Sequence, residues 1–79
     1  MEKEKEEKEI LKRKIEFYHS MNLKCHIKLK PIGFINGKII TPLAEDGQYF
    51  LFQDLRGYSP RRIFIEEIFD IKDYEEIIG

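Results

Sequence analysis

The sequence predicts a mainly β fold, in which an N-terminal α-helix precedes a five-stranded, strongly bent antiparallel small barrel. Residues 23–30 alternate between apolar and polar side chains, which is the pattern of a half-buried antiparallel strand. Further short apolar runs follow, and turn-forming residues separate most of them. Closure of such strands into a barrel is expected because closure removes exposed sheet edges.

The composition limits both the size of the fold and the ways of stabilising it. The chain has 79 residues, enough for one domain, and one cysteine, so an intrachain disulfide is impossible. A domain this small has a marginal core, so we expect dense aromatic and isoleucine packing or oligomerisation. Charged residues make up 37% of the chain, and this abundance resembles the composition of thermophile and archaeal proteins.

The N-terminal residues are charged at positions where a signal peptide needs an apolar segment. Further along the chain, no apolar run has the length that a membrane span requires. We therefore expect a cytoplasmic protein without a membrane partner.

Residues 1–22 are predicted to form an N-terminal helix with a charged, partly frayed start. The apolar side chains of this helix share one broad arc of its surface, and they are Ile10, Leu11, Ile15, Phe17, Tyr18 and Met21. Asn22 can end the helix, because asparagine tolerates the left-handed conformation. We expect the apolar arc to cap an open end of the barrel. The alternative is that the charged extension is a partner-binding arm.

The barrel is predicted to span residues 23–71, with an acidic C-terminal tail at residues 72–79. Its strands are expected at residues 24–30, 33–43, 48–55, 61–65 and 68–71. Gly37 lies within a strand, where glycine usually marks a bulge or a sharp bend. Glu66 and Glu67 interrupt two apolar pieces, so we expect a one-turn link between the last two strands.

Phe50 and Phe52, or the residues that alternate with them, are expected to fill the barrel. The other face of their strand is also apolar and needs cover from the helix or from a neighbouring subunit. Cys25 lies on the inward phase of the first strand, so we interpret it as a small buried hydrophobe. Cys25 and His26 point to opposite faces of a regular strand, so neither a metal site nor another cofactor is predicted.

The charges are unevenly distributed, although the net charge is −1. Residues 23–63 contain seven Lys and Arg against three acids, which gives the barrel a local positive excess. The outward phase of the first strand carries Lys24, His26, Lys28 and Lys30. Such a row can follow a phosphate backbone. The alternative is a charged strand face that prevents edge-to-edge aggregation.

The loop after the third strand is a second candidate site. It carries Arg56, Tyr58, Arg61 and Arg62 on one turn-rich segment. Arginine binds phosphate bidentately, and tyrosine stacks on unpaired bases. Alternatively, these arginines pair with Asp54 or with the acidic C-terminus.

The order of a helix and five short, bent strands is similar to that of the Sm-like (Lsm/Hfq-type) family. The residues that resemble the first Sm motif are Ile27, Leu29, Gly33 and Gly37, with residues 49–54 at its end. Residues 63–71 have the length and apolar rhythm of the second Sm motif. The resemblance covers about two thirds of the chain. It implies a ring or another oligomer built by strand pairing, and RNA contact through some surface.

The chain departs from the family pattern at the RNA pocket. The family's uridine-binding Asn would fall on Tyr49, and its Arg-Gly pair would fall on Phe64 and Ile65. Gly33 and Gly37 are also closer together than in the common Sm motif. The usual pore-side RNA pocket therefore does not carry over to this chain.

We predict a non-enzymatic Sm-like or SH3-like small barrel that forms a homo-oligomer and binds RNA or a ribonucleoprotein. Binding would come from phosphate neutralisation and base stacking. The candidate nucleic-acid-binding residues are Lys24, Lys28, Lys30, Arg56, Tyr58, Arg61 and Arg62. The alternative is a protein-interaction adaptor that meets an acidic protein partner and binds no nucleic acid. One continuous face that carries Lys24, Lys28, Lys30 and the three arginines would favour nucleic acid, and acids interleaved among them would favour a protein partner.

Overall fold

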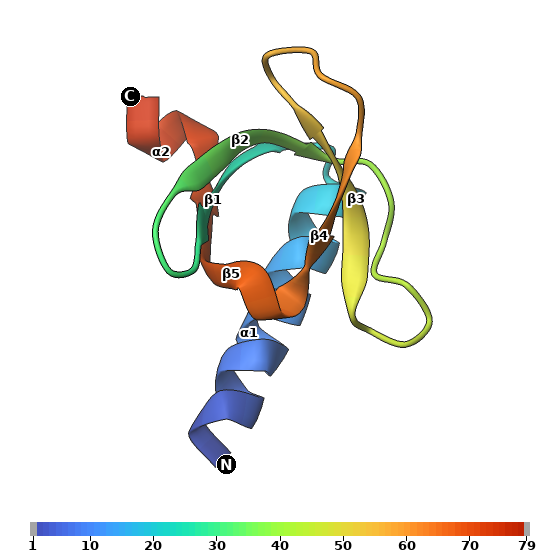
Figure 1. Ribbon diagram of the computed structural model, residues 1–79, viewed down its shortest axis with the longest axis vertical. Helices are drawn as coiled ribbons and strands as arrows, with labels where there is room; N and C mark the ends of the chain where they lie inside the picture. Colours follow the sequence, from blue (N-terminus) through green and yellow to red (C-terminus); the bar gives the residue numbers. More distant parts are fainter. Residues whose placement is uncertain (1, 79) are drawn as a thin grey trace.

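The computed structural model describes residues 2–78, and the side chains of residues 5–77. Its elements in chain order are α1 (Glu2–Ser20), β1 (Lys24–Leu29), β2 (Phe34–Ile39), β3 (Tyr49–Asp54), β4 (Arg61–Phe64), the 3₁₀ turn η1 (Ile65–Glu67), β5 (Ile68–Asp73) and α2 (Tyr74–Ile78). Figure 1 shows this order from the N-terminal helix to the short C-terminal one. The prediction of a mainly β fold behind an N-terminal helix is confirmed.

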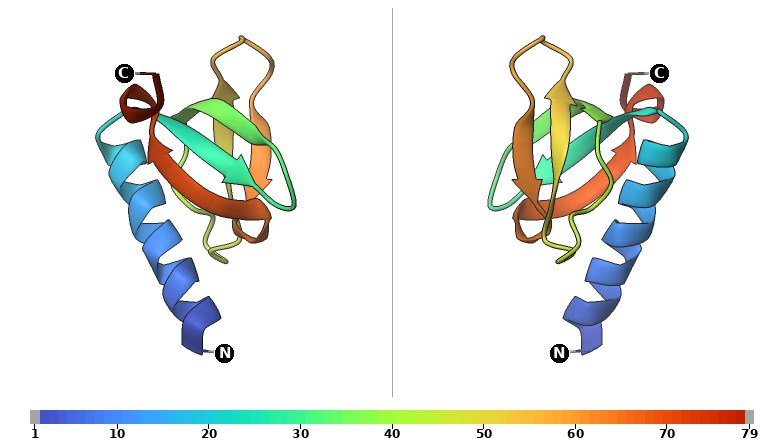
Figure 2. Two further views of the ribbon diagram at one scale, coloured as in Figure 1. Left: turned by 90° about the vertical axis from the view of Figure 1, so that its left-hand side faces the viewer. Right: turned by 90° about the vertical axis from the view of Figure 1, so that its right-hand side faces the viewer.

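The five strands form one antiparallel sheet in the order β4-β3-β2-β1-β5. The sheet is strongly curved, as the two side views show (Figure 2). Within the described part of the chain, β4 and β5 lie at the two edges and do not pair, so the predicted closure into a barrel is not confirmed. Three side chains of α1 enter the core instead, namely Leu11, Ile15 and Tyr18, so this helix covers part of the core that strand closure would otherwise cover.

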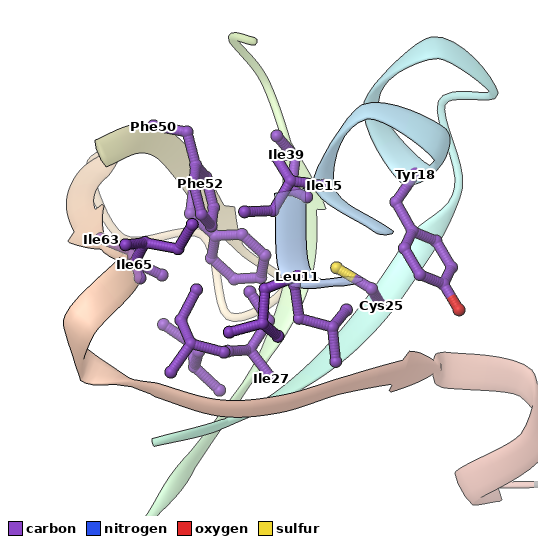
Figure 3. Packing of buried hydrophobic residues seen from close by; sticks show 13 residues of the cluster. Leu11, Ile15, Tyr18, Cys25, Ile27, Ile39, Phe50, Phe52, Ile63 and Ile65 are labelled. Atoms are coloured by element: carbon purple, nitrogen blue, oxygen red, sulfur yellow. The ribbon is translucent and has the colours of Figure 1, made fainter. Parts of the chain in front are cut away.

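The core lies on the concave side of the sheet. Its fully buried side chains are Ile15, Cys25, Ile27, Phe50, Phe52, Ile63, Ile68 and Ile71. Figure 3 shows how side chains from the helix and from the strands meet there. The rings of Phe50 and Phe52 pack edge to face with centroids 6.4 Å apart, and both are fully buried as predicted. Cys25 is also buried as predicted, and burial raises the pKa of its thiol to about 12, with a smaller contribution from Asp73.

The apolar arc of α1 is narrower than predicted. Ile10, Phe17 and Met21 are 52%, 53% and 58% exposed, so they do not cap the core. A straight helix touches a curved sheet along one stripe, and only residues spaced by three or four positions share that stripe. The helix ends as expected, because Asn22 has a left-handed φ of 54°.

An ion pair holds α1 against the β5 edge of the sheet. Nζ of Lys14 lies 2.9 Å from Oδ1 of Asp70 and donates a second hydrogen bond, at 3.1 Å, to the carbonyl oxygen of Ile71. Burial alone raises the pKa of the Asp70 carboxyl. The hydrogen bonds from Lys14 and Ile71, with the charges of Lys14 and Lys72, outweigh burial and lower it.

β2 ends at Ile39, earlier than the predicted residue 43. One more backbone bond follows, from Ile40 N to Leu51 O at 3.0 Å. The Thr41 hydroxyl then accepts the Leu51 N–H at 2.9 Å, and Pro42 has no N–H to donate. The backbone hydrogen bonds between β2 and β3 therefore stop at Thr41 and Pro42.

The C-terminal segment is more regular than a tail. β5 extends to Asp73, beyond the predicted residue 71, and α2 follows it. The Asp73 carboxylate accepts the N–H of Glu75 at 2.9 Å, which stabilises the start of α2. The predicted one-turn link at Glu66 and Glu67 is confirmed as η1, and Glu67 caps it by accepting the N–H of Phe64 at 2.9 Å.

Gly37 lies where β2 comes closest to β3. A Cβ at this position would overlap the carbonyl oxygen of Gln53 and would lie 2.9 Å from the Phe52 ring. The register of β2 runs regularly through Gly37, so no bulge lies there, and glycine is needed because only glycine permits this close approach.

We expect Gly37→Ala to destabilise the fold by about 3 kcal/mol, the upper end of the usual overpacking cost. Two strands would have to separate to admit the methyl group. Urea denaturation followed by circular dichroism measures the change. The neighbouring exposed-face variant Lys38→Ala should stay within about 0.5 kcal/mol of wild type. Equal stability of Gly37→Ala and wild type would show that the close approach is not a constraint.

Candidate functional site

Successive side chains of β1 point to opposite sides of the sheet, which separates an apolar face from a cationic face. Cys25 and Ile27 are buried, whereas Lys24 and Lys28 are exposed on the opposite side of the sheet. His26 shares this outer side, but neighbouring side chains cover it and leave only 7% of it exposed. In the left view of Figure 2, β1 and β5 face the viewer with α1 beside them rather than over them.

The neighbouring strands add two lysines to the same side. Directly paired residues share a face in an antiparallel sheet, and Lys38 of β2 is the partner of Lys24. Lys72 of β5 is the partner of His26. We call the set Lys24, Lys28, Lys38 and Lys72 the lysine face. Lys24 and Lys38 are like charges directly opposite each other, an arrangement that destabilises a sheet.

No member of the lysine face forms an ion pair with another described side chain. The ion pairs found among the described side chains involve Lys12, Lys14, Arg56 and Arg61. Asp70, the partner of Lys28, is the acid on this side of the sheet, and Lys14 binds its carboxylate. Like charges without counterions favour an anionic ligand.

An aromatic side chain stands beside these lysines. Phe34, the partner of Lys28, is 65% exposed. Its ring packs on His26 with centroids 5.1 Å apart and an interplanar angle of 32°. Nδ1 of His26 donates a hydrogen bond of 2.6 Å to Oδ1 of Asn36. The three side chains therefore form a connected group across β1 and β2.

The loop between β3 and β4 has a different electrostatic character. Arg56 donates from Nη2 to Oδ2 of Asp54 at 2.9 Å and from Nε to Oδ1 at 3.1 Å, and its backbone N–H adds a bond of 2.7 Å. These bonds, the side-chain ones foremost, lower the pKa of Asp54 and raise that of Arg56. The guanidinium also stacks on Tyr58 at 4.9 Å. The loop arginines were expected to pair with Asp54 or with the acidic C-terminus if they do not bind phosphate. For Arg56, the pairing with Asp54 is the one observed.

The other predicted residues are dispersed. Arg61 lies 3.8 Å from Glu67, and the Arg62 guanidinium lies 4.8 Å from the Tyr49 ring centroid on the β3-β4 side. Lys30 lines a groove between α1 and β5, where Glu7, Glu66 and Asp70 also lie. Of the seven candidates, the structure brings only Lys24 and Lys28 onto the lysine face.

Sequence reasoning missed Lys38, Lys72 and Phe34. Lys38 could have been found, because it lies on the phase opposite to the apolar positions of β2. Lys72 was assigned to the tail, and only the extension of β5 to Asp73 places it beside His26. Phe34 looks like a core residue in the sequence, and only the strand register places it outside.

Two classes of feature were searched for among the described residues. No group of three or more His, Cys, Asp or Glu side chains is arranged to hold a metal ion in that part of the chain. None of the described helices combines the length and apolar character needed to cross a membrane.

Comparison of the chain with protein-family models, with curated proteins and with solved structures gives no match.

We expect Asp54→Asn to flatten the acid side of the stability profile. The folded pKa of Asp54 is lowered, so its carboxylate stabilises the fold above the unfolded value of about 3.9. This contribution disappears as the pH falls through the folded pKa. Urea denaturation midpoints of wild type and variant, measured from pH 7 to pH 2, test this loss of stability. Arg56→Gln should flatten the same window, because it removes the first cause of the shift. Unchanged acid sensitivity in both variants contradicts this account.

Proposed function

We propose that this chain is a non-enzymatic, cytoplasmic nucleic-acid-binding module whose ligand is RNA or a ribonucleoprotein. The observation that carries the proposal is the lysine face, which presents four cations from three strands without an ion-pair partner among the described side chains. Binding rests on phosphate neutralisation and counterion release, with little reading of base sequence.

Two neighbouring groups extend the proposed surface. Gln53, the partner of Lys38, donates a hydrogen bond of 2.6 Å to the carbonyl oxygen of Tyr58, so the β3-β4 loop is anchored beside the lysine face. Tyr58 is exposed and stacked on Arg56. In this proposal the loop supplies a stacking contact, and Arg56 contributes less than the lysines because it pairs with Asp54.

We also propose that the curved sheet is a small barrel of the Sm-like or SH3-like type that assembles into a homo-oligomer. The support is the strand order, a four-stranded meander whose fifth strand returns to β1 after a 3₁₀ turn. Edge strands readily pair with another chain. Here β4 and β5 are the two edges.

Light scattering coupled to size-exclusion chromatography should give a mass above that of the 9.5 kDa chain. A monomer at all concentrations would remove the oligomer from the proposal.

Charge reversal on the lysine face tests the nucleic-acid proposal. Lys24→Glu removes one cation and offers a carboxylate to Lys38, so we expect tighter sheet pairing, by about 0.2–1 kcal/mol, but weaker binding. The affinity for a fluorescently labelled single-stranded RNA, measured by anisotropy, should fall about tenfold or more at low salt. A variant that gains stability and loses binding cannot be explained by misfolding.

Salt dependence gives the number of phosphate contacts. Four contacts to a single strand predict that log K falls with log salt at a slope near −2.8, or about 50-fold between 50 and 200 mM. Lys24→Glu should reduce the slope by about 1.4, because two lysines lose their phosphates. The matched control is Lys30→Glu, the same charge change in the groove beside α1, which should bind like wild type. Salt-independent binding, or equal losses in both variants, contradicts the proposal.

A protein-interaction module is the second candidate function. Phe17 and Met21 of α1 are more than half exposed, and so are Ile10 and Phe69 at the groove between α1 and β5. Exposed apolar groups of this kind are typical of protein contacts. This reading gains support if wild type binds no nucleic acid at low salt.

A further inference from the structure

An exposed aromatic side chain, Phe34, lies on the sheet beside the lysine face. Phe34 is the first residue of β2, and its ring lies on the outer side of the sheet with 65% of the residue exposed. One side of the ring rests on His26. Exposing a phenyl ring to water is unfavourable, and most of Phe34 remains exposed.

The support beneath this ring is rigid. His26 is 7% exposed and hydrogen-bonded to Asn36, and both residues lie within paired strands rather than in a loop. A side chain held by packing and by a second layer of hydrogen bonds is pre-organised, so a ligand that uses it loses little conformational freedom.

Two cations lie on the side of the ring that faces β1 and β5. Lys28 is the direct cross-strand partner of Phe34, and Lys72 is the partner of His26 on the next strand. Adjacent strands lie about 4.8 Å apart, so Lys28 is one strand and Lys72 two strands from Phe34, and both long side chains can reach phosphates next to a base placed on the ring. The charge of the patch therefore matches a nucleic-acid strand rather than an apolar peptide.

We propose that Phe34 is a base-stacking platform and that the ligand of the lysine face is single-stranded nucleic acid. This inference rests on the proposed function and specifies it further. Bases in a duplex stack on each other and are not available to Phe34, whereas an unpaired base offers its π-face to an aromatic side chain. Lys28 and Lys72 hold phosphates next to that base on the β1 and β5 side, and His26 with Asn36 positions the ring.

The test compares Phe34→Leu with a matched variant, Phe69→Leu. Phe69 is 67% exposed but lines the groove beside α1. The probes are labelled oligouridine, oligothymidine and a duplex of equal length, with binding measured by anisotropy. Phe34→Leu should weaken single-strand binding about tenfold with an unchanged salt slope, and leave duplex binding unchanged. Phe69→Leu should match wild type. The preferred sugar then identifies RNA or DNA as the source of the strand.

A second measurement does not depend on the stability of the leucine variant. The chain contains no tryptophan, so Phe34→Trp introduces a single tryptophan, whose emission can be followed separately from that of the tyrosines. A base stacked on it should quench its emission, whereas a single tryptophan at Phe69→Trp should not respond to oligouridine.

Two results separate the inference from the proposed function. If Phe34→Leu binds like wild type and Phe34→Trp is not quenched, while Lys24→Glu still weakens binding, the platform is overturned and the basic interface stands. If wild type binds no oligonucleotide at all, both are overturned.

Discussion

The close approach of β2 to β3 at Gly37 is the constraint on which the rest of the structure depends. The strand backbones come so near there that a Cβ would overlap the Gln53 carbonyl oxygen. This approach accompanies the curvature that wraps the concave side of the sheet around Phe50 and Phe52. α1 then covers part of the remaining opening, with the Lys14–Asp70 ion pair holding it in place.

The core residues of β1, β2 and β5 point to the concave side of the sheet, so the outer side of these strands does not contribute to the core. It carries the lysine face and Phe34, whereas the arginines of the β3-β4 side are partly neutralised, as the pairing of Arg56 with Asp54 shows. A net charge of −1 hides this asymmetry, because most acids lie in α1 and after residue 63. The placement of charge by strand register therefore says more about a ligand than the total does.

Much of the fold follows from local patterns in the sequence. Alternation identified the strands, Asn22 ended the helix, and the glutamate pair marked the link before β5. Where the structure differs from the predictions, the cause is an interaction between residues that are far apart in the sequence. Lys30 left the outward row because β1 ends at Leu29, and the N–H of Lys30 instead bonds to the carbonyl oxygen of Glu67 at 2.7 Å, beside the groove. Lys72 and Phe34 joined the site through cross-strand pairing, which depends on residues far away in the chain.

The most direct test of the central claim is a titration of the ¹⁵N-labelled chain with a short oligouridine, followed residue by residue in heteronuclear NMR spectra. The claim predicts saturable shift changes concentrated on β1, the start of β2 and β5, with the largest changes near Phe34 and Lys28. Changes concentrated on α1 and the groove at Phe69, with none on the lysine face, would contradict it and favour the apolar surface as the interface.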